Sequence, residues 1–141
     1  MQERELLKKL EGFSSGPWSL VVENKSGLVY RSKDDRLLPL LECIREHSDD
    51  MVAATVLDKM VGRAAALLCV YARVNMILTP IVSDGAVEVL EEFGVPFMAL
   101  ERVKEILNAE KTGPCPMEQE ARSKSPVQFY RSMVRQTPKT C

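Results

Sequence analysis

The chain has 141 residues, a length that fits one domain able to bury its own core. Hydrophobic residues make up 45% and charged residues 28% of it, and the net charge of −1 excludes a general attraction to nucleic acid or membranes. The N-terminal MQERELLKKL is charged, unlike a signal peptide, and no apolar run reaches the length of a membrane span. We therefore expect a cytoplasmic protein.

The first predicted elements are a helix and a β-hairpin. Leucines at helical spacing predict an amphipathic helix over residues 2–12. Two β-rich runs, at 18–23 and 28–32, flank the sequence NKSG, which is typical of a hairpin turn. An aspartate pair then precedes a second predicted helix over residues 36–47.

The rest of the chain alternates between strands and helices. We predict strands over 51–57, 75–82 and 96–100, and helices over 60–74, 83–94 and 101–108. The first of these strands is uninterruptedly apolar, which is typical of a strand buried on both faces. This order predicts an α/β protein with three α/β/α layers, in which helices cover both faces of a mixed five-stranded sheet.

The charge is distributed unevenly along the chain. Residues 119–141 carry five Lys or Arg and one Glu, a net charge of +4, whereas residues 1–118 carry a net charge of −5. Apolar periodicity fades at the same point, so we expect one domain over 1–118 and a basic, flexible tail over 119–141. The tail either rests on the acidic body or serves as an arm for an acidic partner.

The order of elements, together with two motifs, resembles the cytidine-deaminase-like superfamily. The motifs are LDKMVGRAAALL at residues 57–68 and CPME at residues 115–118. They are similar to the signatures of a small, uncharacterised family of bacteria and archaea that is placed in this superfamily by its fold. The resemblance covers about residues 5–118 and implies a deaminase-like fold.

The zinc signature of the superfamily is missing. Catalytic members hold zinc with a His or Cys, followed by a Glu, after the hairpin, and with Pro-Cys-x-x-Cys at the start of the next helix. The matching positions are residues 34–36 and 58–63, and neither stretch contains His or Cys. A three-ligand catalytic zinc site cannot be assembled from these residues. We therefore predict no metal and no cofactor, and the sequence argues against zinc-dependent deaminase activity.

The candidate ligand-binding residues follow the strand at 51–57. Open α/β sheets bind ligands at the carboxyl ends of their strands, and a helix N-terminus offers free N–H groups to an anion. Lys59 and Arg63 could clamp a phosphate, and Gly62 would allow close approach. Asp58 could orient a hydroxyl or amino group, or act as a base. The structural alternative is a helix cap at Asp58, a packing contact at Gly62 and two solvated cations.

Cys115 and Glu118 are candidate catalytic residues. Cys115 could act as a nucleophile or redox thiol with Glu118 as its acid/base partner, if a cation or a helix N-terminus lowers the pKa of the thiol. The same residues equally fit the start of a helix. We expect their segment to close over the pocket at residues 58–63.

Three functions remain open from the sequence. The first is a zinc-independent domain that binds a nucleotide or another phosphorylated small metabolite at the N-terminus of the central helix. The second is an enzyme or redox protein that uses Cys115 with Glu118, and the third is a structural or regulatory homo-oligomer. The aromatic content of 6% argues against nucleic acid as a ligand.

Overall fold

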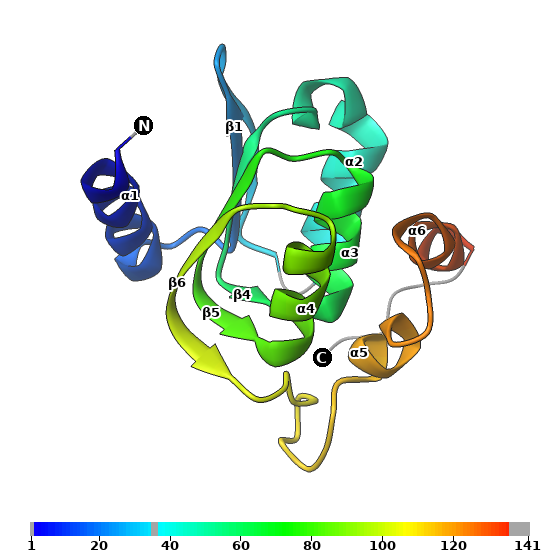
Figure 1. The fold of residues 1–141 in the computed structure, drawn as a ribbon. Coiled ribbons are helices and arrows are strands. Elements are labelled where there is room, and N and C mark those ends of the chain that lie inside the picture. Colours follow the sequence, from blue (N-terminus) through cyan, green and yellow to red (C-terminus); the bar gives the residue numbers. More distant parts are fainter. Residues whose placement is uncertain (1, 35–36, 136–141) are drawn as a thin grey trace.

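The computed structural model of the chain describes residues 2–34 and 37–135. The expected helix start at 35–36 and the end of the expected tail at 136–141 lie outside the described residues. The elements are α1 (Glu3–Ser15), β1 (Leu20–Asn24), β2 (Gly27–Ser32), α2 (Leu38–Met51), β3 (Thr55–Asp58), β4 (Met60–Val61), α3 (Arg63–Tyr71), β5 (Met76–Ser83), α4 (Asp84–Glu92), β6 (Phe97–Val103), α5 (Pro116–Ala121) and α6 (Pro126–Val134) (Figure 1).

The six strands form one mixed sheet. Its order is β2-β1-β3-β5, and both β4 and β6 also pair with β5. β1 is antiparallel to β2 and to β3, whereas β3, β4 and β6 run parallel to β5. This arrangement confirms the expected α/β class with an N-terminal hairpin, although the sheet has six strands where five were predicted.

β4 accounts for the additional strand. β3 and β4 pair with β5 in the same register on either side of Lys59. The backbone N–H of Lys59 itself donates to the carbonyl of Ser19 at 3.1 Å. Because the sheet takes up Met60–Val61, the helix predicted from residue 60 begins only at Arg63.

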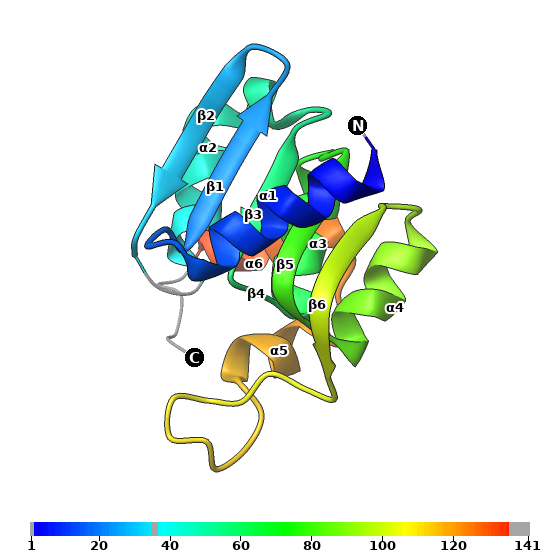
Figure 2. The same ribbon diagram turned by 90° about the vertical axis from the view of Figure 1, so that its left-hand side faces the viewer.

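The helices lie on both faces of the sheet, as expected. α1 packs on one face, and α2, α3 and α4 cover the other (Figures 1 and 2). Under α1, three of its side chains form a cluster with two from the sheet, namely Leu6, Leu10 and Phe13 with Leu57 and Leu78. The larger cluster lies on the other face. Within residues 2–34 and 37–135, no helix is long and apolar enough to cross a membrane.

The stretch 101–108 is not the predicted helix. β6 continues to Val103, because Glu101 and Arg102 pair with β5 along the ladder. Residues 104–115 then form a loop that contains an isolated bridge between Leu107 and Pro114. Pairing with a neighbouring strand has here overridden the local helical pattern.

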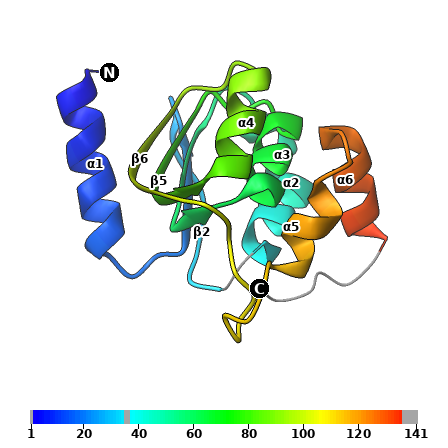
Figure 3. The same ribbon diagram turned by 60° about the horizontal axis from the view of Figure 1, so that its bottom comes forward.

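The stretch expected to be a flexible extension, from residue 119, contains the end of α5 and the whole of α6. α5 and α6 lie against α3, on the side away from the sheet (Figures 1 and 3). Phe129 and Met133 of α6 are 0% and 2% exposed, and Tyr130 stacks on Tyr71 with 4.2 Å between ring centroids. Ser125 and Gln128 form a capping box at the start of α6. α3 is apolar all round, so its outer side needs this cover.

Candidate functional site

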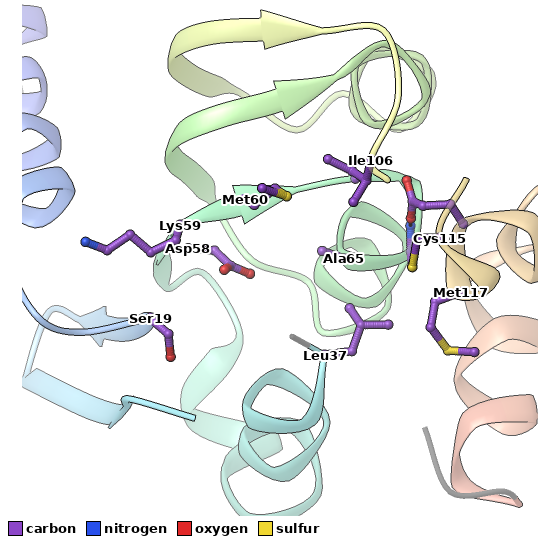
Figure 4. Close-up of a pocket in the computed structure, with 12 residues that line it drawn as sticks. Ser19, Leu37, Asp58, Lys59, Met60, Ala65, Ile106, Cys115 and Met117 are labelled. Atoms are coloured by element: carbon purple, nitrogen blue, oxygen red, sulfur yellow. Dashed lines mark hydrogen bonds between the residues drawn. The ribbon is translucent and has the colours of Figure 1, made fainter. Parts of the chain in front are cut away.

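A cavity of about 210 Å³ lies at the carboxyl end of β3 (Figure 4). Its walls come from the β3–α3 connection, the turn before β1, the start of α2 and the segment that leads into α5. The lining residues are Ser19, Leu37, Asp58, Lys59, Met60, Gly62, Ala64, Ala65, Ile106, Cys115, Met117 and Glu118. Most of these side chains are apolar, and two are carboxylic acids.

Asp58 points its carboxyl group into the cavity (Figure 4). Burial raises the pKa of Asp58 from its ordinary value of 3.8 to about 7, against the opposing effect of the backbone N–H groups of Met60 and Lys59. Near neutral pH the group therefore exists both as an acid and as a carboxylate. It can donate a hydrogen bond in the first form and accept hydrogen bonds in the second.

Lys59 does not complete a phosphate clamp in this structure. Its side chain runs away from Asp58 and toward α1, because successive residues of a strand point to opposite faces of the sheet (Figure 4). The ammonium donates to the carbonyls of Phe13, Ser14 and Gly16 at 2.7, 3.0 and 2.7 Å. Lys59 therefore satisfies orphan carbonyls at the end of α1, where a cation is also favoured by the helix dipole.

Arg63 points away from the cavity as well. Its guanidinium pairs with Glu88 of α4 and lies against Gly85, whose added Cβ would be 3.2 Å from the Arg63 Nε. Arg63 is absent from the cavity lining. Lys59 lines the cavity, but its ammonium is bonded at the end of α1. The structure thus brings Asp58 and Gly62 together at the cavity but separates the two cations.

The N-terminus of α3 is occupied by the Glu118 carboxylate. Its two oxygens accept the backbone N–H groups of Arg63 and Ala64, each at 2.7 Å. Gly62 makes this contact possible, because a Cβ there would lie 2.2 Å from the Glu118 Oε1. Burial raises the pKa of Glu118, while the two N–H groups and the charges of Arg63 and Arg122 oppose that rise. The anion-binding position that we expected a ligand to use is filled by the chain itself.

Cys115 reaches the cavity but does not face Glu118 as a catalytic pair. It is 2% exposed, it is the N-cap residue of α5, and its sulfur is disulfide-bonded. The Glu118 carboxylate is directed at α3. Cys43 and Cys69 are free and buried, and burial raises the pKa of the Cys43 thiol to about 12. In the part of the chain that the structure describes, no group of three His, Cys, Asp or Glu could hold a metal ion.

Several wall residues were not identified from the sequence. They are Ser19, Leu37, Met60, Ala64, Ala65, Ile106 and Met117. Each is an ordinary apolar or small residue whose local pattern predicts core packing. The hydroxyl of Ser19 is already used, since it donates to the carbonyls of Ser32 and Asp34 at 2.8 and 2.6 Å. No sequence signal separates such walls from the rest of the core.

Comparisons with solved structures show where this fold occurs. The chain is similar to a DUF1893 family protein, TM1506, from Thermotoga maritima, with a TM-score of 0.83 and 25% identity over 96% of this chain and 91% of that one. It also matches RibD from Acinetobacter baumannii, form 1 and form 2, with TM-scores of 0.49 and 0.46 and identities of 14% and 16%. Those matches cover 67% and 68% of this chain and 33% and 34% of RibD. No curated protein matches the chain.

The sequence model of one family spans nearly the whole chain. It is described as TM1506, a domain of unknown function (DUF1893), and it matches residues 8–135. That range extends from α1 through α6, so it includes every wall of the cavity as well as the two C-terminal helices. The chain therefore belongs to the DUF1893 family.

Proposed function

We propose that this domain binds a small heterocycle bearing N–H groups, the chemical class that includes nucleobases, in the cavity at Asp58. The observation that carries the proposal is a carboxyl group aimed into a small, mainly apolar cavity at the carboxyl end of a sheet strand. Ligand sites in open α/β sheets lie at this edge. They combine apolar walls with a few polar groups that fix the orientation of the ligand.

The size of the cavity sets an upper limit on the ligand. Its 210 Å³ lies below the range of about 300–1,000 Å³ that is usual for ligand pockets. An apolar cavity of about 150 Å³ accommodates benzene, so one heterocyclic ring fits here. The ring of a larger molecule would enter only if the remainder stayed outside.

The electrostatics of the cavity favour a neutral or cationic group over a phosphate. Asp58 and Glu118 both line it, and an ionised carboxylate repels an anion. Lys59 and Arg63, the expected phosphate clamp, are bonded to α1 and to Glu88. A nucleotide or phosphorylated metabolite would consequently bind with its base at Asp58 and its phosphate directed away from the cavity.

The carboxyl group of Asp58 supplies the recognition in this proposal. As a carboxylate it accepts hydrogen bonds from ring N–H or amino groups, and as an acid it pairs with a ring nitrogen and a neighbouring N–H. A hydrogen bond to a charged group contributes about 1.5–3 kcal/mol. Removing the carboxyl group should therefore weaken binding by about tenfold or more.

A binding panel tests the proposal directly. Adenine, cytosine and benzimidazole are titrated into the protein by calorimetry, with toluene and inorganic phosphate as comparison probes. At least one N–H heterocycle should bind, and Asp58→Ala should raise its Kd about tenfold or more. Asp49→Asn, an exposed carboxylate on α2, is the matched control and should bind like the unmodified protein. Equal affinity in Asp58→Ala, or binding by none of the heterocycles, would overturn the proposal.

The two other functions are hypotheses that separate observations would have to support. A catalytic thiol at Cys115 needs the reduced state, and Glu118 would have to leave α3 to assist it. A homo-oligomer needs a surface shared between copies, which an edge strand of the sheet such as β2 or β6 would have to provide. Ligand binding in the cavity at Asp58 requires neither a rearrangement of Glu118 nor a second copy of the chain.

A further inference from the structure

Strand β6 forms one edge of the sheet. In the part of the chain that the structure describes, it pairs with β5 alone, in a parallel ladder that keeps one register from Phe97 opposite Ile77 to Val103 opposite Ser83. Figure 2 shows α4 behind β6 and no further strand beside it. The outer edge of β6 is therefore open to another strand.

The outer edge of β6 carries a row of backbone N–H and C=O groups. The backbone N–H of Ile77 donates to the carbonyl of Pro96 at 3.1 Å, so Pro96 and every second residue after it direct their backbone groups toward β5. The alternate residues direct theirs away from β5, and they are Phe97, Ala99, Glu101 and Val103. Such a row is a template for pairing with a strand of another chain.

The opposite edge strand, β2, is protected against such pairing in two ways. Its register with β1 shifts within the ladder, and Arg31 and Lys33 place two exposed cations at its end. Both features discourage pairing between edges. In contrast, β6 has a continuous register, and its cation Arg102 is bonded to Asp84 at 2.6 Å. Leu100, at the midpoint of β6, is 46% exposed.

The sequence of β6 is complementary to itself about Leu100. When a second copy runs antiparallel with a two-fold axis at this residue, each residue faces the one that lies equally far from Leu100 in the other copy. Leu100 then faces itself in a pair without mutual backbone hydrogen bonds, where side chains approach most closely. Phe97 faces Val103, a favourable pair of an aromatic and a β-branched residue. Met98 faces Arg102, whose aliphatic stem can pack on it.

Charge and length favour this register over its neighbours. A two-fold axis at Glu101 would place two glutamates opposite each other, and an axis at Arg102 would do the same with two arginines, which is destabilising. An axis at Ala99 would leave Arg102 and Val103 without a facing residue in the strand. The axis at Leu100 pairs all seven residues of Phe97–Val103.

We propose that two copies of this chain pair through β6, antiparallel and centred on Leu100, to form a dimer with one continuous sheet. The outward backbone groups of β6 then bond to those of the second copy, and the exposed Leu100 side chains cover each other. A two-fold pairing closes on itself, so it gives a dimer and not a fibre. Among the described residues, none of β6 lines the Asp58 cavity, so this inference does not depend on the proposed ligand.

Sedimentation equilibrium over a range of protein concentrations tests the dimer. The unmodified protein should have twice the mass of one chain, whereas Leu100→Lys should have the mass of a single chain, because it sets two ammonium groups against each other at the axis. Leu28→Lys is the matched control, since it adds the same charge at a leucine of β2 that is 55% exposed, and it should remain a dimer. A monomeric unmodified protein, a dimeric Leu100→Lys or a monomeric Leu28→Lys would contradict pairing through β6.

An engineered disulfide tests the register and also serves if Leu100→Lys does not fold. Facing residues in antiparallel strands have Cβ atoms about 4.5–5.5 Å apart, close to the separation that a disulfide requires. Mild oxidation should therefore link Leu100→Cys into a covalent dimer on a non-reducing gel. Glu101→Cys, which faces Ala99 of the second copy, should link several-fold less, and the unmodified protein gives the background from its own cysteines. Equal linking of the two variants, or linking of Leu100→Cys at the background level, would rule out the proposed pairing.

Discussion

The surroundings of one carboxyl group set the chemistry of the cavity. Asp58 ends β3 on the face that α3 covers, and alanine, leucine and methionine side chains provide much of the wall. Burial disfavours the charged form and raises the pKa of Asp58 to about 7. A group with this pKa is suited to recognising a ligand that can both donate and accept hydrogen bonds.

The raised pKa of Asp58 predicts a dependence of stability on pH. Between its ordinary value of 3.8 and about 7, the folded protein binds more protons than the unfolded chain. The contribution of Asp58 to the free energy of unfolding should therefore be most favourable below this window, fall as the pH rises through it, and level off above pH 7. The loss is at most about 4 kcal/mol, because each pKa unit corresponds to about 1.4 kcal/mol.

Urea unfolding of Asp58→Asn at pH 5 and pH 8 measures this contribution. The variant should lose the part of the pH dependence that comes from Asp58, so it gains stability relative to the unmodified protein at pH 8. Asp49→Asn, with an exposed side chain, should follow the unmodified profile. Parallel pH profiles for Asp58→Asn and the unmodified protein would contradict the assignment.

Lys59 and Asp58 are neighbours in the sequence, but their side chains lie in different surroundings. Its ammonium lies 4.8 Å from the Phe13 ring centroid and bonds to three carbonyls at the end of α1. The Lys59 ammonium is therefore directed away from the Asp58 carboxyl group. This separation keeps the pKa of Asp58 high, since a neighbouring ammonium would lower it.

At the scale of elements, β4, α5 and the wall of the cavity meet at the start of α3. β4 leads through Gly62 into α3, and α5 approaches this connection closely enough for a carboxylate to cap α3. Gly62 is buried, and its missing side chain leaves the space that Glu118 and Ile106 occupy. The cap on α3 and the packing of Ile106 beside the cavity therefore depend on one glycine.

Gly62→Ala should destabilise the protein through this contact. The new Cβ would lie 2.2 Å from Glu118 Oε1 and 2.8 Å from Ile106 Cγ1, so these two side chains have to move. We expect a loss of about 1–3 kcal/mol in the free energy of unfolding, measured in urea.

Two comparisons make the Gly62→Ala result specific. Gly12→Ala, in α1 with no atom within 4 Å of its added Cβ, should be neutral or stabilise by up to about 1 kcal/mol. In the double variant Gly62→Ala/Glu118→Ala, the combined loss should be smaller than the sum of the single losses. Additive losses would mean that Gly62 does not act through Glu118.

At the scale of the whole molecule, the C-terminal helices complete the core. α6 covers the outer side of α3, and Phe129 lies in the same buried cluster as residues of the sheet. The family match to residue 135 covers α6 as well. Packed structure therefore continues beyond residue 118, through α6.

Phe129→Ala should accordingly cost about 3–5 kcal/mol of stability, the usual loss for a fully buried phenylalanine. Val127→Ala on the same helix, at a position that is 45% exposed, should change the free energy of unfolding by less than about 0.5 kcal/mol. Urea denaturation of both variants checks this. A flexible tail would instead give two similarly small effects.

The sequence predicted elements with a long apolar pattern better than short elements or elements that depend on pairing with a neighbouring strand. The run before Asp58 and the apolar helix after Gly62 were identified because their patterns are local. The helix predicted over 101–108 was wrong, because the edge of β5 holds Phe97–Val103 as a strand. The apolar side chains of α6 lie in the stretch that was predicted to be a flexible tail. Their packing was not predicted, because their partners on α3 lie far away in the sequence.

By itself, the sequence determined the α/β class, the hairpin, the carboxylate at the end of β3 and the lack of a zinc signature. These features follow from periodicity and residue type over a few neighbouring positions. Only the tertiary structure decided that Asp58 faces a cavity while Lys59 faces α1, and that Glu118 fills the start of α3. The physical reason is that these outcomes depend on strand pairing and on the return of a segment distant in sequence.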